Sequence, residues 1–290
     1  MRLSCLPVSF FADLLDGRMT VGEWARLGAQ LGLDGIDLSI LFVPERSVAG
    51  AEALRRQVDD AGMRVVMLTS YPDFTHPDPV RRRREAELAL ESAAIAGALG
   101  ADYLRVTAGQ AHPQTGRADG IAWAVEGLQG LVAASRGLGI TLVYENHAKP
   151  GAWQYTDFSQ PPDIFLEIAR QTASCGLRIN FDTGNAAAFA GDPLALLDAV
   201  LPRVATVHAS DTATTGALQH VLLGTGVAPM EALFARLARS GWDGWICMEE
   251  ASGLGRDGVA RAAAFVRSAW QRAAADWPPA PAAQPTGGSA

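Results

Sequence analysis

The chain has 290 residues, 49% hydrophobic and 19% charged, so it is long enough to bury a full hydrophobic core. Its net charge of −7 argues against a general nucleic-acid binder, which needs a basic surface to neutralise phosphates. Three scattered cysteines are too few for a disulfide framework, and no CxxC or CxxH pair in the sequence indicates a structural zinc site.

The first fifteen residues lack the ordered regions of a signal peptide. No apolar run reaches the roughly 18 residues that a membrane-spanning helix needs. From the sequence we therefore expect a cytoplasmic protein with no membrane partner.

Short apolar runs alternate with segments of helical periodicity along the whole chain. The predicted strands are residues 2–6, 35–39, 64–69, 103–107, 141–145, 178–182, 205–208 and 245–249. Helical periodicity is found in residues 21–31, 51–61, 82–99, 120–137, 163–171, 194–200 and 230–239. Several of these segments end in a glycine typical of a left-handed helix cap, such as Gly32, Gly100 and Gly139.

Eight strand–helix units predict an α/β fold, a (β/α)8 TIM barrel that forms a single domain over residues 1–275. A doubly wound open sheet is the alternative, but no Gly-rich phosphate turn follows the first strand. Residues 276–290 are rich in Pro, Ala and Gly, which predicts a disordered tail.

The active site of a TIM barrel lies at the carboxyl ends of its strands. There, the last four predicted strands carry metal-capable side chains: Glu145, Asp182, His208 and Glu249. They are 37, 26 and 41 residues apart, each about one strand–helix unit. Any one of them alone is more often a solvated rim charge or a structural histidine. Four in register on consecutive strands favour a metal site.

Side chains alternate between the two faces of a strand, which tests this register. The residues expected to point inward with the four ligands are Val143, Asn180, Thr206 and Cys247. Those expected to face the surrounding helices are Tyr144, Phe181, Val207 and Met248. The outward set is apolar, as packing against helices requires, so the assignment is self-consistent.

Three carboxylates and one imidazole form a hard, oxygen-rich donor set. This set predicts one divalent ion, Mn²⁺ or Mg²⁺, and tolerates Co²⁺ or Zn²⁺. Four protein ligands leave open positions at which a substrate with two adjacent oxygens could chelate. The ion would then polarise a carbonyl and stabilise an enediolate.

The loop after the fifth strand holds three more candidates. Lys149 is the only lysine beside 23 arginines, so it is predicted to act as a compact charge or proton carrier. His147 is a candidate general acid or base. Trp153 could wall the pocket or stack on a sugar. Each has a simpler alternative. Lys149 could be retained by chance, His147 could be bonded to a backbone carbonyl, and Trp153 could be a hydrophobic anchor.

Three further residues are candidates for substrate binding. Asn185 and Asp211 are predicted to bind hydroxyl groups or to support His208 and the metal. Arg105, on the fourth strand, is a weaker candidate. The Gly224-Thr225-Gly226 segment is too short for a phosphate loop and predicts a tight turn.

Several motifs resemble the sugar phosphate isomerase/epimerase family, of the xylose-isomerase-like TIM barrel superfamily. They are Glu-Asn-His at 145–147, Phe-Asp-Thr-Gly-Asn at 181–185, His-Ala-Ser-Asp at 208–211, Gly-Thr-Gly at 224–226 and Gly-Trp-Asp-Gly-Trp-Ile-Cys-Met-Glu at 241–249. The resemblance implies that Glu145, Asp182, His208 and Glu249 bind the metal. It also implies that Glu145 and Glu249 move protons on opposite faces of an enediolate.

The chain departs from the ketose 3-epimerases of that family at two places. They carry a substrate-binding histidine where Asn185 stands, and an arginine that residues 211–219 of this chain lack. Both departures weigh against a free-ketose 3-epimerase and leave the metal chemistry untouched.

The leading hypothesis is a metal-dependent isomerase or epimerase that moves a proton through an enediolate of a sugar or sugar-derived ketone. The alternative is a lyase, of the inosose or 3-dehydroshikimate dehydratase type or one that cleaves a C-glycoside, with His147 or Lys149 as the acid. A non-catalytic sugar- or metal-binding protein is a minor alternative. An endonuclease IV-like role is disfavoured by the acidic charge and by only five histidines. The expected partner is a small sugar or polyol ketone, and the chain could form a homo-oligomer.

Overall fold

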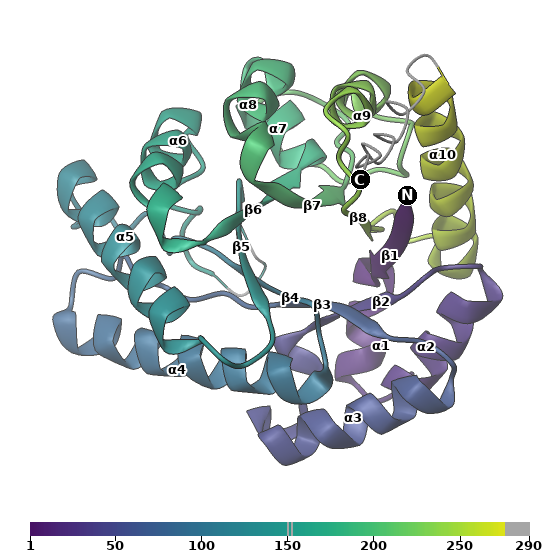
Figure 1. Cartoon of the computed structure of the whole chain (residues 1–290), viewed down its shortest axis with the longest axis horizontal. Coiled ribbons are helices and arrows are strands. Elements are labelled where there is room, and N and C mark those ends of the chain that lie inside the picture. The colour runs from purple at the N-terminus through teal and green to yellow at the C-terminus, as the bar shows by residue number, and fades with distance from the viewer. Residues whose placement is uncertain (150, 152, 276–290) are drawn as a thin grey trace, which may run out of the picture.

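The computed structural model describes residues 1–149, 151 and 153–275. Parallel strands fill the centre of the molecule, and helices surround them (Figure 1). The strands are β1 (Arg2–Leu6), β2 (Ile36–Ser39), β3 (Val65–Thr69), β4 (Tyr103–Val106), β5 (Thr141–Glu145), β6 (Arg178–Asp182), β7 (Val204–Ala209) and β8 (Trp245–Glu249). The α-helices are α1 (Phe11–Leu15), α2 (Val21–Gln30), α3 (Val48–Asp60), α4 (Pro79–Leu99), α5 (Arg117–Ala134), α6 (Pro162–Gln171), α7 (Thr183–Phe189), α8 (Pro193–Val200), α9 (Met230–Arg239) and α10 (Gly255–Ala275).

The sheet has the strand order β1-β8-β7-β6-β5-β4-β3-β2, with every ladder parallel. β1 also lies beside β2, where Ser4 Oγ donates a hydrogen bond of 2.7 Å to Asp37 Oδ2. The Asp34 N–H donates to the Leu3 carbonyl at 2.8 Å. The sheet thus closes almost completely, which confirms the predicted TIM barrel.

The strand boundaries agree with the sequence prediction to within one residue at each end, whereas several helices begin earlier. α3 begins at Val48 because the Ser47 side chain caps it by accepting a hydrogen bond from the Gly50 N–H. α4 begins at Pro79, where Asp78 is the cap, and ends at Gly100, whose φ of +69° confirms the predicted left-handed cap.

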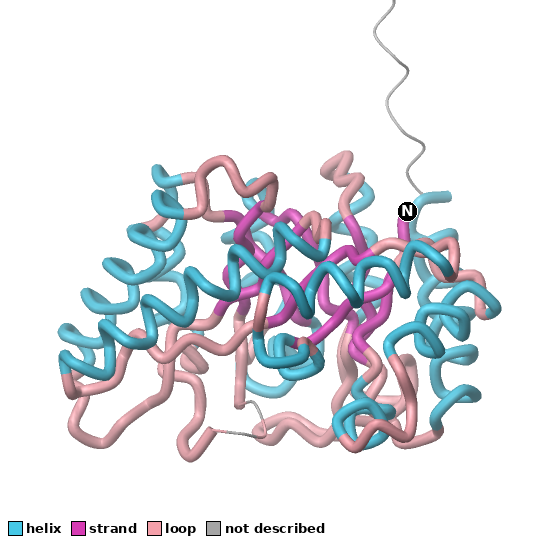
Figure 2. Tube along the Cα trace, turned by 90° about the horizontal axis from the view of Figure 1, so that it is seen from below, coloured by secondary structure: helices cyan, strands magenta, loops and turns pink. Residues whose placement is uncertain are grey.

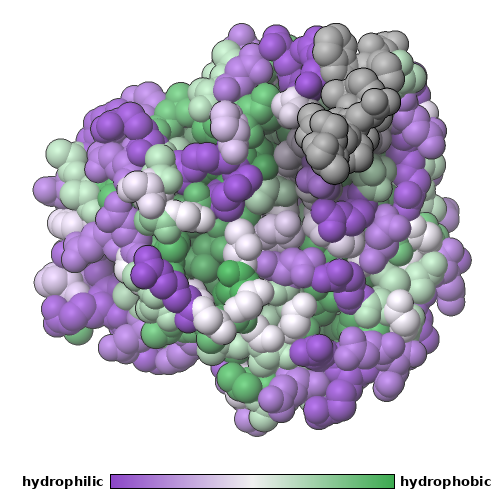
Figure 3. Space-filling model, viewed as in Figure 1, coloured by the Kyte–Doolittle hydropathy of each residue, from purple (hydrophilic) through white to green (hydrophobic). Residues whose placement is uncertain are grey.

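Two apolar layers hold the barrel together. The outer layer lies between strands and helices and contains Tyr144, Phe181, Val207 and Met248, as predicted. The inner layer fills the barrel with Val66, Met67, Val143, Trp245 and Cys247. Figure 3 shows hydrophilic residues over the outer helices and hydrophobic residues toward the middle of the face in view.

The loops differ in length at the two ends of the barrel. In Figure 2 the longer loops gather at the edge opposite the start of β1, which is the carboxyl end of the parallel strands. Within the described ranges, no helix is long and apolar enough to cross a membrane. The predicted tail, residues 276–290, lies outside the described residues.

Candidate metal centre and active-site cavity

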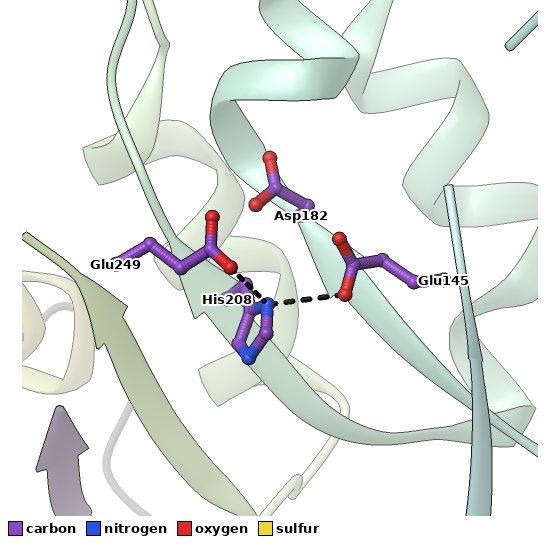
Figure 4. Close-up of side chains that lie close together, drawn as sticks. All are labelled: Glu145, Asp182, His208 and Glu249. Carbon is purple, nitrogen blue, oxygen red and sulfur yellow. Dashed lines mark ion pairs between the residues drawn. The ribbon is translucent and has the colours of Figure 1, made fainter. Parts of the chain in front are cut away.

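Glu145, Asp182, His208 and Glu249, here called the ligand cluster, lie near the carboxyl ends of β5 to β8 and point toward one another (Figure 4). One ligand atom from each residue lies within 4.8 Å of the others. His208 Nδ1 is 3.1 Å from Glu145 Oε2 and 3.2 Å from Glu249 Oε1. The strand register predicted from the sequence therefore brings the four side chains together.

Burial and the close approach of charged groups shift the pKa values of the residues in the ligand cluster. Burial and the neighbouring Glu249 and Glu145 raise the pKa of Asp182 well above its ordinary value. Burial opposes the charge of His208, but Glu145 and Glu249 outweigh it and raise the pKa of the imidazole. Burial also opposes the charge of Glu145, but Arg105 and His208 hold the pKa of that carboxyl below its usual range.

The ligand cluster fits a divalent cation. Glu145 Oε1 is buried without a hydrogen-bond partner among the described residues, so it is free to ligate. A bound cation would lower the mutual repulsion of three carboxylates gathered around one imidazole nitrogen. The donor set is one that Mn²⁺ and Mg²⁺ accept.

Side chains on the inner face of the barrel hold the ligands in place. Asn180 Nδ2 donates to Glu145 Oε2 at 2.8 Å, and Thr206 Oγ1 donates to Asn180 Oδ1 at 2.7 Å. Ser210 Oγ donates to Asp182 Oδ1 at 2.9 Å. Such hydrogen bonds fix the orientation of ligand carboxylates. Asn180 and Thr206 point inward as the alternation pattern predicts.

Asp182 has a second function that the sequence pattern does not reveal. Its Oδ1 accepts a hydrogen bond of 2.6 Å from the Asn185 N–H and thereby caps α7, which begins immediately after β6. The cap fixes the Asp182 side chain at the end of its strand. It also places Asn185 in the first turn of α7, beside the cavity.

A cavity of about 690 Å³ adjoins the ligand cluster at Glu249. Five predicted residues line it in addition to Glu249: Arg105, His147, Lys149, Trp153 and Asn185. They come from β4, the β5–α6 loop and α7, so residues distant in sequence meet on one side of the barrel. This is the position at which TIM barrels bind their substrates.

Two buried partners orient the candidate residues. Arg105 Nε lies 3.1 Å from Glu145 Oε2, and its guanidinium lies 4.6 Å from the centre of the Tyr71 ring. His147 Nδ1 lies 3.5 Å from the fully buried Asp157 Oδ2. No sequence pattern marks Asp157, because only the path of the loop brings it back to His147.

Asp211 lies beneath the β7–α9 loop, and it is not among the residues that line the cavity. Its carboxylate accepts hydrogen bonds of 2.9–3.0 Å from four backbone N–H groups, those of Thr212, Gly224, Gly226 and Ala228. The Gly224 φ of +85° belongs to the turn predicted there. In the structure, Asp211 fixes this loop.

A family model described as "Xylose isomerase-like TIM barrel" matches residues 25–269 of this chain. Among curated proteins, the "Putative hydroxypyruvate isomerase" of Streptomyces coelicolor is 28% identical over 218 residues, or 71% of this chain and 75% of that protein. The sequence match thus extends over most of both proteins.

Solved structures share the fold at low identity. A D-tagatose 3-epimerase-like protein superimposes with a TM-score of 0.77 and 17% identity, covering 95% of this chain and 99% of that chain. The probable 3-DHS dehydratase of petrobactin synthesis from Bacillus anthracis has a TM-score of 0.72 and 15% identity, covering 92% and 99%. With a matching family model over most of its length, this chain belongs to the xylose isomerase-like TIM barrel family.

Proposed function

We propose that the chain is a divalent-metal-dependent isomerase or epimerase that acts on a sugar or a sugar-derived ketone. The observation that carries the proposal is the ligand cluster, whose donor atoms lie within 4.8 Å of one another at the wall of a large cavity. Membership of the xylose isomerase-like family and the similarity to a protein named as a hydroxypyruvate isomerase support it.

The residues of the ligand cluster would hold Mn²⁺ or Mg²⁺, which supplies Lewis-acid polarisation of a substrate carbonyl when bound. Glu249 adjoins the cavity, and burial opposes its charge while His208 lowers its pKa. It can therefore accept a proton from the carbon next to the carbonyl. Glu145, kept ionised by Arg105, can exchange a proton on the other face of the same carbon.

Neighbouring side chains would bind and orient the substrate. Asn185 Oδ1 is buried without a hydrogen-bond partner among the described residues, and Asn185 lines the cavity. A substrate hydroxyl would satisfy it. Trp153 offers an aromatic surface to a sugar ring, and Lys149 offers an exposed ammonium in the same wall. These roles are part of the proposal.

A lyase is the second candidate, and the pairing of His147 with Asp157 favours it. The buried Asp157 carboxylate lies 3.5 Å from Nδ1, and His147 lines the cavity. His147 could therefore act as the general acid that protonates a departing hydroxyl or aglycone after the proton on carbon has been removed.

Metal content is the first test. Wild-type protein exposed to Mn²⁺ and desalted is expected to retain about one ion per chain by mass spectrometry, because all four ligands are present. His208→Ala should lose the ion. The matched control is His220→Ala, which changes a histidine of the cavity wall outside the ligand cluster and should retain the ion. Wild-type protein without metal would contradict the proposal.

Solvent deuterium exchange then tests the chemistry. Metal-loaded protein incubated in deuterated buffer with ketoses, hydroxypyruvate and inososes should incorporate deuterium next to the carbonyl of its substrate. No incorporation in any of them by metal-loaded protein would count against the isomerase. If His147→Ala retained deuterium exchange but lost product formation, the result would favour the lyase.

A further inference from the structure

The cavity divides into two halves according to the strands that supply its walls. β1 to β3 lie together in the sheet, β5 to β7 lie on the opposite side of the barrel, and β4 and β8 separate them. Arg105 of β4 and Glu249 of β8 therefore stand at the two boundaries. A molecule that reaches from one half to the other lies between Arg105 and Glu249.

The half beside β5 to β7 is suited to a sugar. Its walls present His147, Lys149, Trp153, Asn185 and His220, which offer hydrogen-bonding groups and one aromatic ring. We call this the polar half.

The half beside β1 to β3 is lined mainly by hydrocarbon and is here called the apolar half. Its apolar residues are Leu6, Val8, Phe11, Leu15, Ile40 and Leu41, together with Leu88 and Ala89 of α4. Its polar side chains include Arg46 and Glu85. Leu15 is 53% exposed and Leu41 is 44% exposed, so two large apolar side chains face solvent in the wall of one cavity. Contiguous apolar surface that lines a cavity is typical of ligand-binding sites.

The apolar half is preformed by the connections after β1 and β2. The Phe11 ring packs edge-on against Phe42 at 4.8 Å between centroids, which joins the two connections. Glu45 and Arg46 hold φ values of 54° and 45°, in the left-handed region that residues other than glycine rarely adopt. Residues in such conformations persist where the surrounding structure fixes them, and they cluster at ligand sites.

We propose that the substrate is a keto-sugar joined to an apolar, ring-sized group, such as an aromatic aglycone, and that the apolar half binds that group. This inference rests on the proposed function and specifies its substrate class. A cavity of about 690 Å³ lies within the range of about 300–1,000 Å³ typical of drug-sized ligands, so a free sugar would leave the apolar half to water. Because the apolar half is continuous with Glu249, its occupant is attached close to the reacting carbon.

A matched pair of ligands tests the inference. Calorimetric titration of Mn²⁺-loaded protein uses the phenyl and methyl glycosides of one aldohexose that carries a free keto group on a non-anomeric ring carbon. The phenyl compound should bind at least about tenfold more tightly. Leu15→Ser and Leu41→Ser should reduce that preference several-fold without changing methyl binding. The control is Leu254→Ser, equally exposed at 50% but outside the cavity wall, which should keep the preference. The inference would be wrong if the wild-type protein bound the two ligands equally well, or if the leucine variants lost the same affinity for both.

Two more measurements separate the possible failures. If deuterium exchange proceeded equally well with both glycosides, the inference of an apolar substituent would be wrong. The proposal of an isomerase would still hold. A phenyl preference without exchange would support the apolar half and reject the isomerase. Sedimentation at the titration concentrations tests a second copy of the chain as occupant. The inference would be wrong if the protein formed a dimer that Leu41→Ser dissociates and if the phenyl and methyl compounds bound with equal affinity.

Discussion

At the scale of residues, the ligand cluster shows how a chain can hold three carboxylates close together, two of them fully buried. Arg105, only 1% exposed, lies against Glu145, while His208 lies between Glu145 and Glu249. These two cations offset much of the negative charge before any metal is present. The high pKa of His208 means that the metal-free protein carries a proton on the nitrogen that a metal would need.

Metal binding is therefore expected to release protons and to tighten as the pH rises. A metal displaces the proton that Glu145 and Glu249 stabilise on His208, so acid competes with the metal. Titration with Mn²⁺ at pH 7 in two buffers of different ionisation enthalpy should show release of about one proton or more per ion. The affinity should fall steadily between pH 8 and pH 6. An affinity independent of pH would contradict this account.

Asn180 supports Glu145 and is itself held by Thr206, so Asn180→Ala removes two hydrogen bonds at once. We expect its Mn²⁺ affinity to fall by about 10–100-fold, because the Glu145 carboxylate loses its orientation. Competition with a fluorescent chelator measures the loss. Ser135→Ala, which removes a buried hydroxyl outside the ligand cluster, is the control and should bind normally. Equal affinities of Asn180→Ala and wild type would mean that Glu145 needs no support.

At the scale of elements, the β7–α9 loop depends on a single carboxylate. Gly226 lies so close to Asp211 that a Cβ on Gly226 would approach the carboxylate oxygen to 2.4 Å. The loop brings Leu218 and His220 to the cavity wall. The position of two wall residues is therefore tied to a buried hydrogen-bond network that does not itself line the cavity.

Asp211→Ala is expected to destabilise the protein by about 3 kcal/mol, because four backbone N–H groups lose a charged acceptor. Urea unfolding measures the change. The control is Asp198→Ala, whose ion pair with Arg236 at 3.0 Å is exposed and should contribute under about 1 kcal/mol. Similar losses in the two variants would show that the loop does not depend on Asp211.

The sequence predicts the strands and the ligand cluster because both follow a strict period. Alternation along β5 to β8 places Asn180 and Thr206 inward and Phe181 and Val207 outward, and the structure agrees. Contacts made through loops have no such period. Asp157 reaches His147 only by the path of the β5–α6 loop, and the apolar half depends on α1, a five-residue helix with too few turns to show periodicity.

At the scale of the whole molecule, the ligand cluster comes entirely from the second half of the barrel, β5 to β8. The first and last strands must nevertheless meet for the cavity to exist. β1 pairs with β8 in register, and Ser9 N–H donates to the Glu250 carbonyl at 2.9 Å. The buried Glu250 side chain accepts further hydrogen bonds from Ser9 Oγ and the Ser252 N–H.

Glu250→Ala should cost about 2–3 kcal/mol, because it removes a buried charged acceptor at this seam. Unfolding should remain a single transition, since the seam and the rest of the barrel share one sheet. Circular dichroism and tryptophan fluorescence, followed together in urea, should give coincident curves. Separate transitions would mean that part of the barrel unfolds on its own.

The placement of Lys149 gives the molecule an unusual chemical handle. It is the only lysine in the sequence, and its exposed side chain lines the cavity. A reagent selective for ε-amines would therefore label this chain at one position, at the mouth of the site. An environment-sensitive dye attached there would report ligand binding directly, without any assay of turnover.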